Sequence, residues 1–173
     1  LQDYNKGVLT ENIIKEVGAI ANEKNKPEGF YPKKKNSLAD KNVTLFKPNL
    51  KELREGLGIT IKDESIDDIT NAIDLLHKEL NCKYIMTTLS ERGVLIKDYD
   101  TNTCHHIPAH LRKIADVSGA GDTVLSVAML CLVCKQEANN IAALSNLAGG
   151  LVCEELGAVS INKERLLAES KKI

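Results

Sequence analysis

Amphipathic helical segments alternate along this chain with short apolar stretches, and this alternation restricts the fold more than any other feature. Residues 65–80 and 10–25 both place apolar side chains at helical spacing. The first stripe consists of Ile66, Ile69, Ile73, Leu76 and Leu80. Short strand-like runs, "VTLF" at 43–46 and "KYIMTTL" at 83–89, follow such segments. Since a crossover helix joins parallel strands, the pattern predicts an α/β fold with a mostly parallel sheet and helices on both faces.

The remaining elements fit the same architecture. Two strands at 93–99 and 103–108 flank the turn "DTN", which predicts an antiparallel hairpin. We expect a short helix from Asn49 to Gly56 or Gly58, and further elements by the same reasoning. These are helices at 122–135, 138–156 and 163–172 and a strand at 158–161. The stretch "EGFYPKKKN" at 28–36 carries glycine, proline and a lysine cluster where a strand is due, so we predict irregular structure there.

Composition and length indicate one ordinary globular domain spanning residues 1–173. The chain has 43% hydrophobic residues, a net charge of −1 and a pI near 6.5, which argues against a nucleic-acid partner. The longest apolar run, residues 124–134, is shorter than the roughly 20 residues of a membrane span, and the first residues lack signal-peptide character. Five irregularly spaced cysteines favour a reducing compartment, so we expect a cytoplasmic protein without disulfides. Cys131 and Cys134 lie in an apolar helix and predict no metal site.

The turn "SGAGD", which ends at Asp122 and precedes an apolar helix, is the clearest functional candidate. Glycines at a helix N-terminus expose backbone N–H groups, and the positive end of the helix favours an anion there. If that anion is a phosphoryl group in transfer, Asp122 can accept the proton of the attacking hydroxyl. The alternative is that Asp122 only caps the helix and the glycines only form a tight turn. A dinucleotide fingerprint is excluded because Val124 replaces its third glycine, and the Gly-Lys-Ser/Thr of a Walker motif is absent from the chain.

The segment "DVSGAGDTV" at 116–124 resembles the signature of the ribokinase-like (PfkB) sugar kinases. The resemblance implies that Asp122 is the catalytic base and that the amides of Gly119, Ala120 and Gly121 hold the γ-phosphate. It also implies ATP and Mg²⁺ as cofactors and a three-layer α/β/α, ribokinase-like fold. The signature indicates the reaction but not the sugar.

Three further segments match the same family. "PNLKE" at 48–52 resembles its Asn-x-x-Glu element, which implies that Asn49 and Glu52 help to organise magnesium and phosphate. The two residues are equally a helix-capping pair. "TTLSERGVLI" at 87–96 and the helix around Asn146 resemble the nucleotide-binding segments, although alone they read as a hairpin turn and a packed core helix. The resemblance assigns nucleotide contacts to Thr88, Ser90, Glu91, Gly93 and Asn146.

The start of the chain favours one branch of the family. "DYNKGVLT" at 3–10 resembles the Asp-Tyr-x-Lys-Gly segment of kinases of D-glycero-D-manno-heptose 7-phosphate, the ADP-heptose enzymes of lipopolysaccharide synthesis. This implies that Asp3, Tyr4 and Lys6 lie near a phosphorylated sugar, whereas by itself the segment is an ordinary surface turn. The alternatives are a kinase for fructose, ribose or a nucleoside, or a nucleotide-binding module without catalysis.

Two departures from the family qualify the resemblance. Tyr31 stands where these kinases carry an aspartate. The N-terminal half of the family, which holds the lid and most sugar-binding residues, has no counterpart before Leu1. The resemblance therefore implies a C-terminal, ATP-binding and catalytic portion without the lid half, and a homodimer for a full-length protein, since the lid often forms the dimer contact. No adenylyltransferase His-x-Gly-His element is present, so any activity would be that of a kinase alone.

Overall fold

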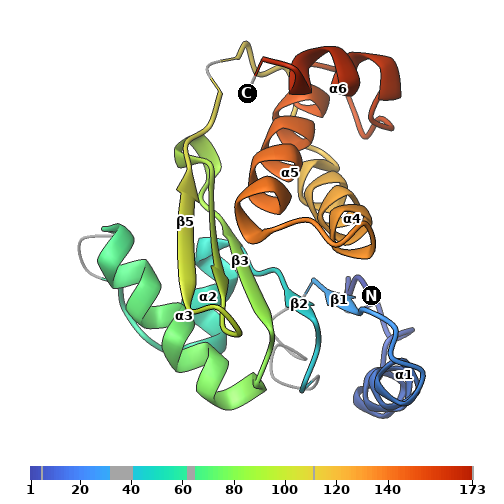
Figure 1. Ribbon diagram of the computed structural model, residues 1–173, viewed down its shortest axis with the longest axis vertical. Helices are drawn as coiled ribbons and strands as arrows, with labels where there is room; N and C mark the ends of the chain where they lie inside the picture. Colours follow the sequence, from blue (N-terminus) through green and yellow to red (C-terminus); the bar gives the residue numbers. More distant parts are fainter. Residues whose placement is uncertain (5, 32–40, 62–64, 111, 173) are drawn as a thin grey trace.

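The computed structural model describes residues 1–4, 6–31, 41–61, 65–110 and 112–172, and within them one mixed sheet forms the centre of the molecule (Figure 1). Its strand order is β1-β2-β3-β4-β5. The strands are β1 (Gly29–Phe30), β2 (Leu45–Phe46), β3 (Tyr84–Thr88), β4 (Val94–Asp98) and β5 (Thr103–Ile107). The first three pair in parallel, and β4 is antiparallel to both β3 and β5. Every strand except β4 therefore runs in the same direction, as the predicted parallel sheet with a hairpin requires.

Helices cover both faces of this sheet. They are α1 (Glu11–Glu23), α2 (Leu50–Leu57), α3 (Ile66–Leu80), α4 (Ala120–Val133), α5 (Ala138–Val152) and α6 (Lys163–Ser170). Figure 1 shows α2 and α3 on one side of the sheet and α4 and α5 on the other. The polar side chains of Thr10, Ser65 and Asn162 cap α1, α3 and α6 by accepting a hydrogen bond from a first-turn amide. The α/β three-layer prediction is confirmed.

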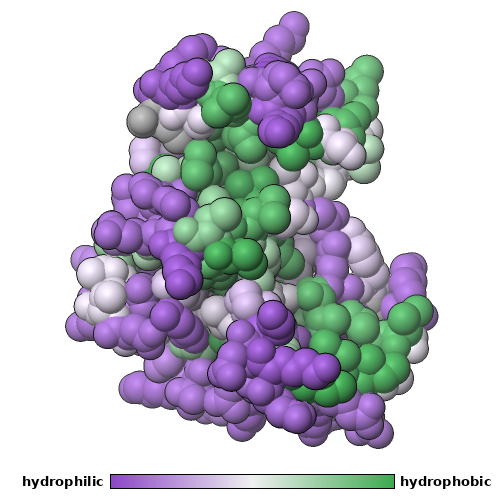
Figure 2. All heavy atoms as spheres, turned by 45° about the vertical axis from the view of Figure 1, so that its right-hand side comes forward, coloured by the Kyte–Doolittle hydropathy of each residue, from purple (hydrophilic) through white to green (hydrophobic). Residues whose placement is uncertain are grey.

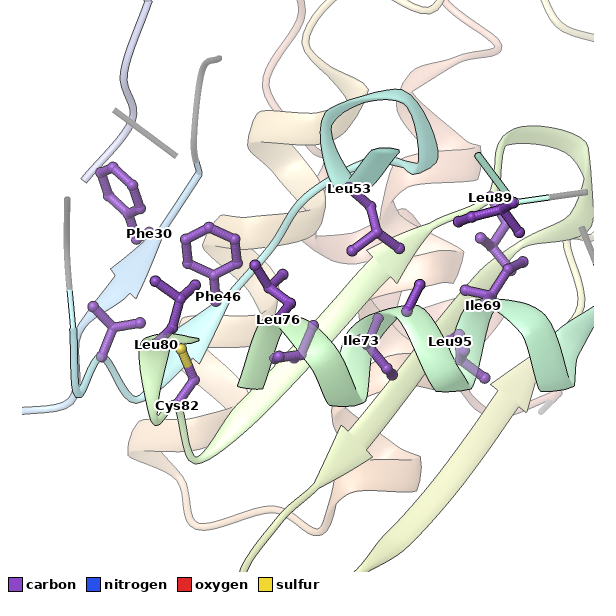
Figure 3. Packing of buried hydrophobic residues seen from close by; sticks show 14 of the residues in the cluster. Phe30, Phe46, Leu53, Ile69, Ile73, Leu76, Leu80, Cys82, Leu89 and Leu95 are labelled. Atoms are coloured by element: carbon purple, nitrogen blue, oxygen red, sulfur yellow. The ribbon is translucent and has the colours of Figure 1, made fainter. Parts of the chain in front are cut away.

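Alternating side chains of the strands build a separate core on each face. On β3, Ile85 faces the α3 side, whereas its neighbour Met86 packs with α4 and α5. Figure 3 shows Ile69, Ile73 and Leu76 of α3 directed at the sheet. Because both faces are buried there, β1 and β2 are apolar throughout, whereas the edge strand β5 is largely exposed and carries polar residues.

Two sequence predictions need correction. Residues 29–30 form strand β1 inside the stretch predicted to be irregular, because Leu45 and Lys47 on β2 and just beyond it donate backbone hydrogen bonds to Glu28 and Phe30. The rest of that stretch from residue 32 lies outside the described residues. The predicted strand at 158–161 is wrong: α5 ends at Val152, and the residues that follow form turns and bends that lie largely exposed and pair with no strand.

The outer surface of α1 is unusually apolar. Its predicted stripe forms a helix, but only Ile14 and Gly18 are buried, while Ile13, Val17 and Ile20 stay exposed. Figure 2 shows a broad hydrophobic area at the lower right, where Figure 1 has α1. Among the described residues, no helix combines the length and hydrophobicity that a bilayer span requires.

Candidate active site

The carboxyl ends of the parallel strands and the N-terminus of α4 meet at one edge of the sheet. Tyr31 and Lys47 come directly after β1 and β2. Gln2 forms a parallel bridge with Tyr31, so the start of the chain adds a short strand segment beside β1, and Tyr4 follows it. Ligands of open α/β sheets bind outside the carboxyl ends of the strands. This edge is therefore the candidate site.

The glycine turn begins α4 without a side-chain cap. Gly119 is the N-cap residue, with a left-handed φ of 78°, and it has no side chain to offer the free amides. Ala120 donates its N–H weakly to Val117 at 3.3 Å, and Thr123 closes the first helical bond to Gly119 at 3.0 Å. The turn places the first-turn amides and the positive helix end at the site edge.

Gly121 lies against the tyrosine that replaces the expected aspartate. A Cβ at Gly121 would lie 2.9 Å from the hydroxyl oxygen of Tyr31, so a side chain here would have to displace the phenol. The Tyr31 ring in turn lies under a cation, because the Lys47 Nζ is 3.6 Å from its centroid. The first turn of α4 thus packs directly on the residues that follow β1 and β2.

Asp122 does not cap its helix. It occupies the third helical position, and no side chain makes a capping hydrogen bond at the α4 N-terminus. The Tyr4 hydroxyl donates to the Asp122 Oδ2 at 2.9 Å. The other carboxylate oxygen, Oδ1, is buried and has no hydrogen-bond partner among the described residues. The capping alternative for Asp122 is therefore wrong, and one carboxylate oxygen stays available for a ligand.

The segment before the glycine turn is tied to the loop after α5. Asp116 accepts hydrogen bonds from the Ser118 N–H at 2.9 Å, from the Ser118 hydroxyl at 2.8 Å and from the Gly157 N–H at 3.0 Å. These bonds, first of all the one from the Ser118 amide, lower the pKa of Asp116. The amides of Ala115 and Asp116 both donate to the Cys153 carbonyl. The position of the turn is therefore fixed by the α5 end.

Asn49 and Glu52 form a complete capping box on α2. The Glu52 N–H donates to Asn49 Oδ1 at 2.8 Å, and the Asn49 N–H donates to Glu52 Oε2 at 2.9 Å. Asn49 also bridges Thr88 at the end of β3, so three of the predicted residues lie together. The capping interpretation is confirmed, and a role in organising magnesium stays a prediction. The described part of the chain holds no cluster of three or more His, Cys, Asp or Glu side chains that could bind a metal ion.

Ser90, Glu91 and Gly93 form the turn that joins β3 to β4. Ser90 and Glu91 lie exposed in a 3₁₀ turn, Ser90–Arg92, and Ser90 has a positive φ of 55°. Gly93 has φ 90°, and a Cβ there would lie 2.0 Å from the Ile107 carbonyl oxygen of the neighbouring strand. Glycine at 93 is therefore required by backbone packing. The hairpin interpretation is confirmed, and nucleotide contacts by Ser90 and Glu91 stay a prediction.

Asn146 lies buried on α5 and binds the protein itself. Its Nδ2 donates to the Pro108 carbonyl at 2.9 Å, which fastens the chain after β5 to α5. Near it, Gly149 brings α5 close to α4, because a Cβ there would lie 2.6 Å from Val124 Cγ2. The packed-core interpretation of this helix is confirmed, and an adenine contact by Asn146 stays a prediction.

The three predicted sugar-side residues occupy different environments. Asp3 is 2% exposed, and its amide donates to the Tyr31 carbonyl at 3.1 Å. Tyr4 is 56% exposed and reaches Asp122, whereas Lys6 is exposed on the surface. Tyr4 is therefore the member of this group that the fold brings to the glycine turn.

The sequence analysis did not predict Lys47 at this edge of the sheet, and it assigned no role to Tyr31. Lys47 is fully buried although it is a lysine, and Tyr31 appeared only as a departure from the family. The available signal was position, because each residue directly follows a buried strand whose carboxyl end lies at the site. The contact between them depends on the β1–β2 pairing, which the sequence did not predict.

Comparisons with known proteins place the chain among sugar kinases. The family model of the pfkB family carbohydrate kinases matches residues 8–165. A relative named "Bifunctional protein HldE", from Syntrophotalea carbinolica, is 35% identical over 166 residues, or 96% of this chain. A protein of the same name from Campylobacter fetus is also 35% identical, over 91% of the chain. The chain spans only 33% of the length of each of these relatives.

Solved structures with the same fold are sugar kinases too. Phosphofructokinase-2 from Escherichia coli in complex with potassium superposes with a TM-score of 0.81 and 19% identity over 92% of this chain and 52% of its own. Arabidopsis thaliana ribokinase complexed with ribose and ATP gives a TM-score of 0.79 and 17% identity over 95% of this chain and 53% of its own. These likenesses show the ribokinase-like fold. With the family match across residues 8–165, they establish that the chain belongs to the pfkB family of carbohydrate kinases.

Proposed function

We propose that this chain is the catalytic portion of an ATP-dependent sugar kinase in which Asp122 accepts the proton of the attacking sugar hydroxyl. The observation that carries the proposal is the environment of the Asp122 carboxylate. It lies in the first turn of a helix whose N-cap residue has no side chain, and Tyr4 donates to one of its oxygens, while the other is buried with no partner in the part of the chain that the structure describes. A positioned carboxylate next to an anion site is the arrangement that phosphoryl transfer to a hydroxyl requires.

The residues at the start of α4 are suited to bind a nucleoside triphosphate. The start of α4 has no side-chain cap, so its first-turn amides and the positive end of the helix can receive phosphate oxygens. ATP would supply the γ-phosphoryl group, and Mg²⁺ would neutralise its charge. Magnesium in such sites is held by one or two carboxylates together with the substrate phosphates, so Glu52 beside Asn49 is the proposed carboxylate.

The proposed acceptor is D-glycero-D-manno-heptose 7-phosphate, converted to the 1,7-bisphosphate for lipopolysaccharide heptose synthesis in the cytoplasm. Two observations support this choice over other sugars. The relatives with the name HldE reach 35% identity over nearly the whole chain, whereas the superposed phosphofructokinase-2 reaches 19%. In addition, Tyr4 lies in the segment that resembles heptose 7-phosphate kinases, and its hydroxyl donates a hydrogen bond to Asp122 at the glycine turn.

The test is a comparison of acceptors and of one variant. ATP-dependent phosphorylation is measured on heptose 7-phosphate, fructose 6-phosphate, ribose and a nucleoside, with the wild-type protein and with Asp122→Asn. We expect the highest kcat/KM on heptose 7-phosphate and a loss of roughly 10²–10⁴-fold in Asp122→Asn. A higher kcat/KM on another sugar would overturn the acceptor, and a loss of less than about tenfold would overturn the base.

A nucleotide-binding module without catalysis is the second candidate. The chain spans about half of each superposed sugar kinase. Calorimetry separates the two candidates. ATP binding without turnover on any acceptor would support the module and contradict the kinase.

A further inference from the structure

The hydrogen bond between Tyr4 and Asp122 joins the segment beside β1 to the first turn of α4. The two residues lie 118 positions apart in the sequence, and the Tyr4 hydroxyl donates to the Asp122 Oδ2 at 2.9 Å. Nothing in a helix N-terminus itself requires such a partner, because helix-starting acids ordinarily bond to their own first-turn amides. The contact therefore needs a reason outside the local structure of α4.

Backbone hydrogen bonds fix the place from which Tyr4 reaches Asp122. The Tyr31 N–H donates to the Leu1 carbonyl at 3.0 Å, and the Asp3 N–H donates to the Tyr31 carbonyl at 3.1 Å. Asp3 itself is only 2% exposed. Tyr4 thus extends from an anchored strand segment beside β1, so its hydroxyl is held in place by the sheet rather than by a free terminus.

Donor and acceptor chemistry fixes the direction of the two hydrogen bonds that the Tyr4 hydroxyl makes with Gln2 and Asp122. The Gln2 Nε2 lies 2.9 Å from the Tyr4 hydroxyl oxygen and can only donate to it. The single phenolic proton is then directed to the carboxylate, which can only accept when ionised. The result is a relay from Gln2 through Tyr4 to Asp122, and each bond polarises the next.

The two carboxylate oxygens of Asp122 are therefore unequal. Oδ2 is occupied by the phenol, while Oδ1 is buried without a partner among the described residues. We propose that Tyr4 is a positioning residue for phosphoryl transfer: it holds Oδ2 so that Oδ1 faces the sugar hydroxyl as the proton acceptor. This inference rests on the proposed kinase function, and it deepens it by assigning the reacting oxygen.

A rival explanation is that Tyr4 merely occupies the place of the absent sugar hydroxyl. Tyr4 is 56% exposed, so a sugar could displace it. The two explanations predict opposite kinetics. A positioning phenol contributes to kcat and acts through Asp122, whereas a placeholder competes with the sugar and its removal lowers the KM for the sugar.

The test removes only the hydroxyl, in Tyr4→Phe. We expect kcat to fall about 10- to 100-fold, as for a misplaced catalytic group, with the KM for ATP unchanged. In the double variant Tyr4→Phe/Asp122→Asn, kcat should equal that of Asp122→Asn alone, because Tyr4 acts through the carboxylate. Gln2→Ala should give a smaller loss in the same direction.

Tyr99→Phe is the matched control. Its hydroxyl donates to the Ile73 carbonyl and to Asp74, on the α3 side of the sheet and away from the glycine turn. This variant should keep the wild-type kcat and both KM values. A loss equal to that of Tyr4→Phe would mean that removing any phenol disturbs the enzyme, and it would overturn the inference.

A measurement without turnover separates this inference from the proposed function. The ¹³Cγ resonance of Asp122, observed by NMR in the substrate-free protein, should shift in Tyr4→Phe and stay in place in Tyr99→Phe. An unchanged resonance in Tyr4→Phe would show that the bond is not formed in solution and would overturn the inference even if the chain is a kinase. If Asp122→Asn retains turnover, the proposed base fails instead. A lower KM for the sugar with unchanged kcat in Tyr4→Phe would establish the placeholder.

Discussion

Helices α2 and α4 both begin at the carboxyl end of the sheet with an acidic residue at the third helical position, yet the two acids do different things. In α2, Glu52 turns back to the Asn49 amide, and Asn49 accepts from the Glu52 amide, so the helix start is closed. In α4, the N-cap residue is Gly119, which has no side chain, and Asp122 makes no capping bond.

The difference lies in the residue before the helix. Asparagine at the cap satisfies the first-turn amides and holds the glutamate in place, which stabilises the helix. Glycine at the cap leaves the amides open, and Asp122 is then positioned by Tyr4, far away in the sequence. The start of α2 is therefore stabilised by its own side chains, whereas the acid at the start of α4 is held by a residue from another segment.

The largest predicted effect comes from replacing each of the two acids with its amide. Asp122→Asn should lose roughly 10²–10⁴-fold in phosphoryl transfer with little change in thermal stability, because this carboxylate caps nothing. Glu52→Gln should lose less turnover than Asp122→Asn, because it removes a proposed magnesium carboxylate and not the proposed base, while its amide oxygen can still accept from the Asn49 amide. Steady-state kinetics and thermal melts of both variants check this. Equal kinetic losses in the two would remove the distinction between the helix starts.

The second prediction concerns how neighbours hold α4. In Gly149→Ala the new methyl group would lie 2.6 Å from Val124 Cγ2, and such overpacking costs about 1–3 kcal/mol, partly offset by the roughly 0.5–1 kcal/mol that alanine adds to a helix. We expect a net loss of stability in urea unfolding.

Gly150→Ala is the control for that prediction. Its Cβ would lie 3.3 Å from the side chain of Arg112, which pairs with Glu154 and Glu169, so we expect a smaller loss of stability than in Gly149→Ala. If both variants are equally stable, the close approach of α5 to α4 does not constrain the glycine turn.

The third prediction concerns a variant that lacks the side-chain cap of α2. Asn49→Ala should cost about 0.5–2 kcal/mol of stability, or roughly 2–4 °C in Tm for each kcal/mol, because it removes the Oδ1 that accepts from the Glu52 amide, although the backbone N–H at position 49 can still donate to Glu52. Asn162→Ala, which removes a cap with one bond at α6, should cost less. Equal losses would show that the burial of α2 against the core adds nothing to the stabilisation that its cap provides.

The smallest predicted effect is a pH dependence at the segment before α4. The pKa of Asp116 lies below its ordinary value of 3.8, chiefly because the Ser118 amide donates to the carboxylate. A carboxyl group with a lowered pKa adds stability above pH 3.8 and loses it as the pH falls through the lowered pKa. Urea unfolding of Asp116→Asn should therefore show a weaker loss of stability on acidification than the wild type. Asp67→Asn, at an exposed acid in the first turn of α3, should keep the wild-type profile, and identical profiles for all three proteins would refute the effect.

Much of the fold could be predicted because local patterns carry it. The apolar stripe of α3 and its Ser65 cap, the hairpin of β4 and β5, and the Asn49 capping box all follow from residues close in sequence. Strand β1 was missed because two residues, Gly29 and Phe30, have no periodicity of their own, and only pairing with β2 makes them a strand. The strand predicted at 158–161 failed for the converse reason, since an apolar run without a neighbouring edge stays a turn.

The sequence by itself determined the elements, the uncapped glycine start of α4 and the acid three positions into that helix, because each depends on residues within one or two turns. The tertiary structure alone decided what surrounds that acid. Tyr4, Tyr31 and Lys47 come from separate segments, and only parallel strand pairing brings their ends to one edge of the sheet. Backbone hydrogen bonds between strands carry no sequence signature of their own partner, so the neighbours of Asp122 become visible only once the sheet is assembled.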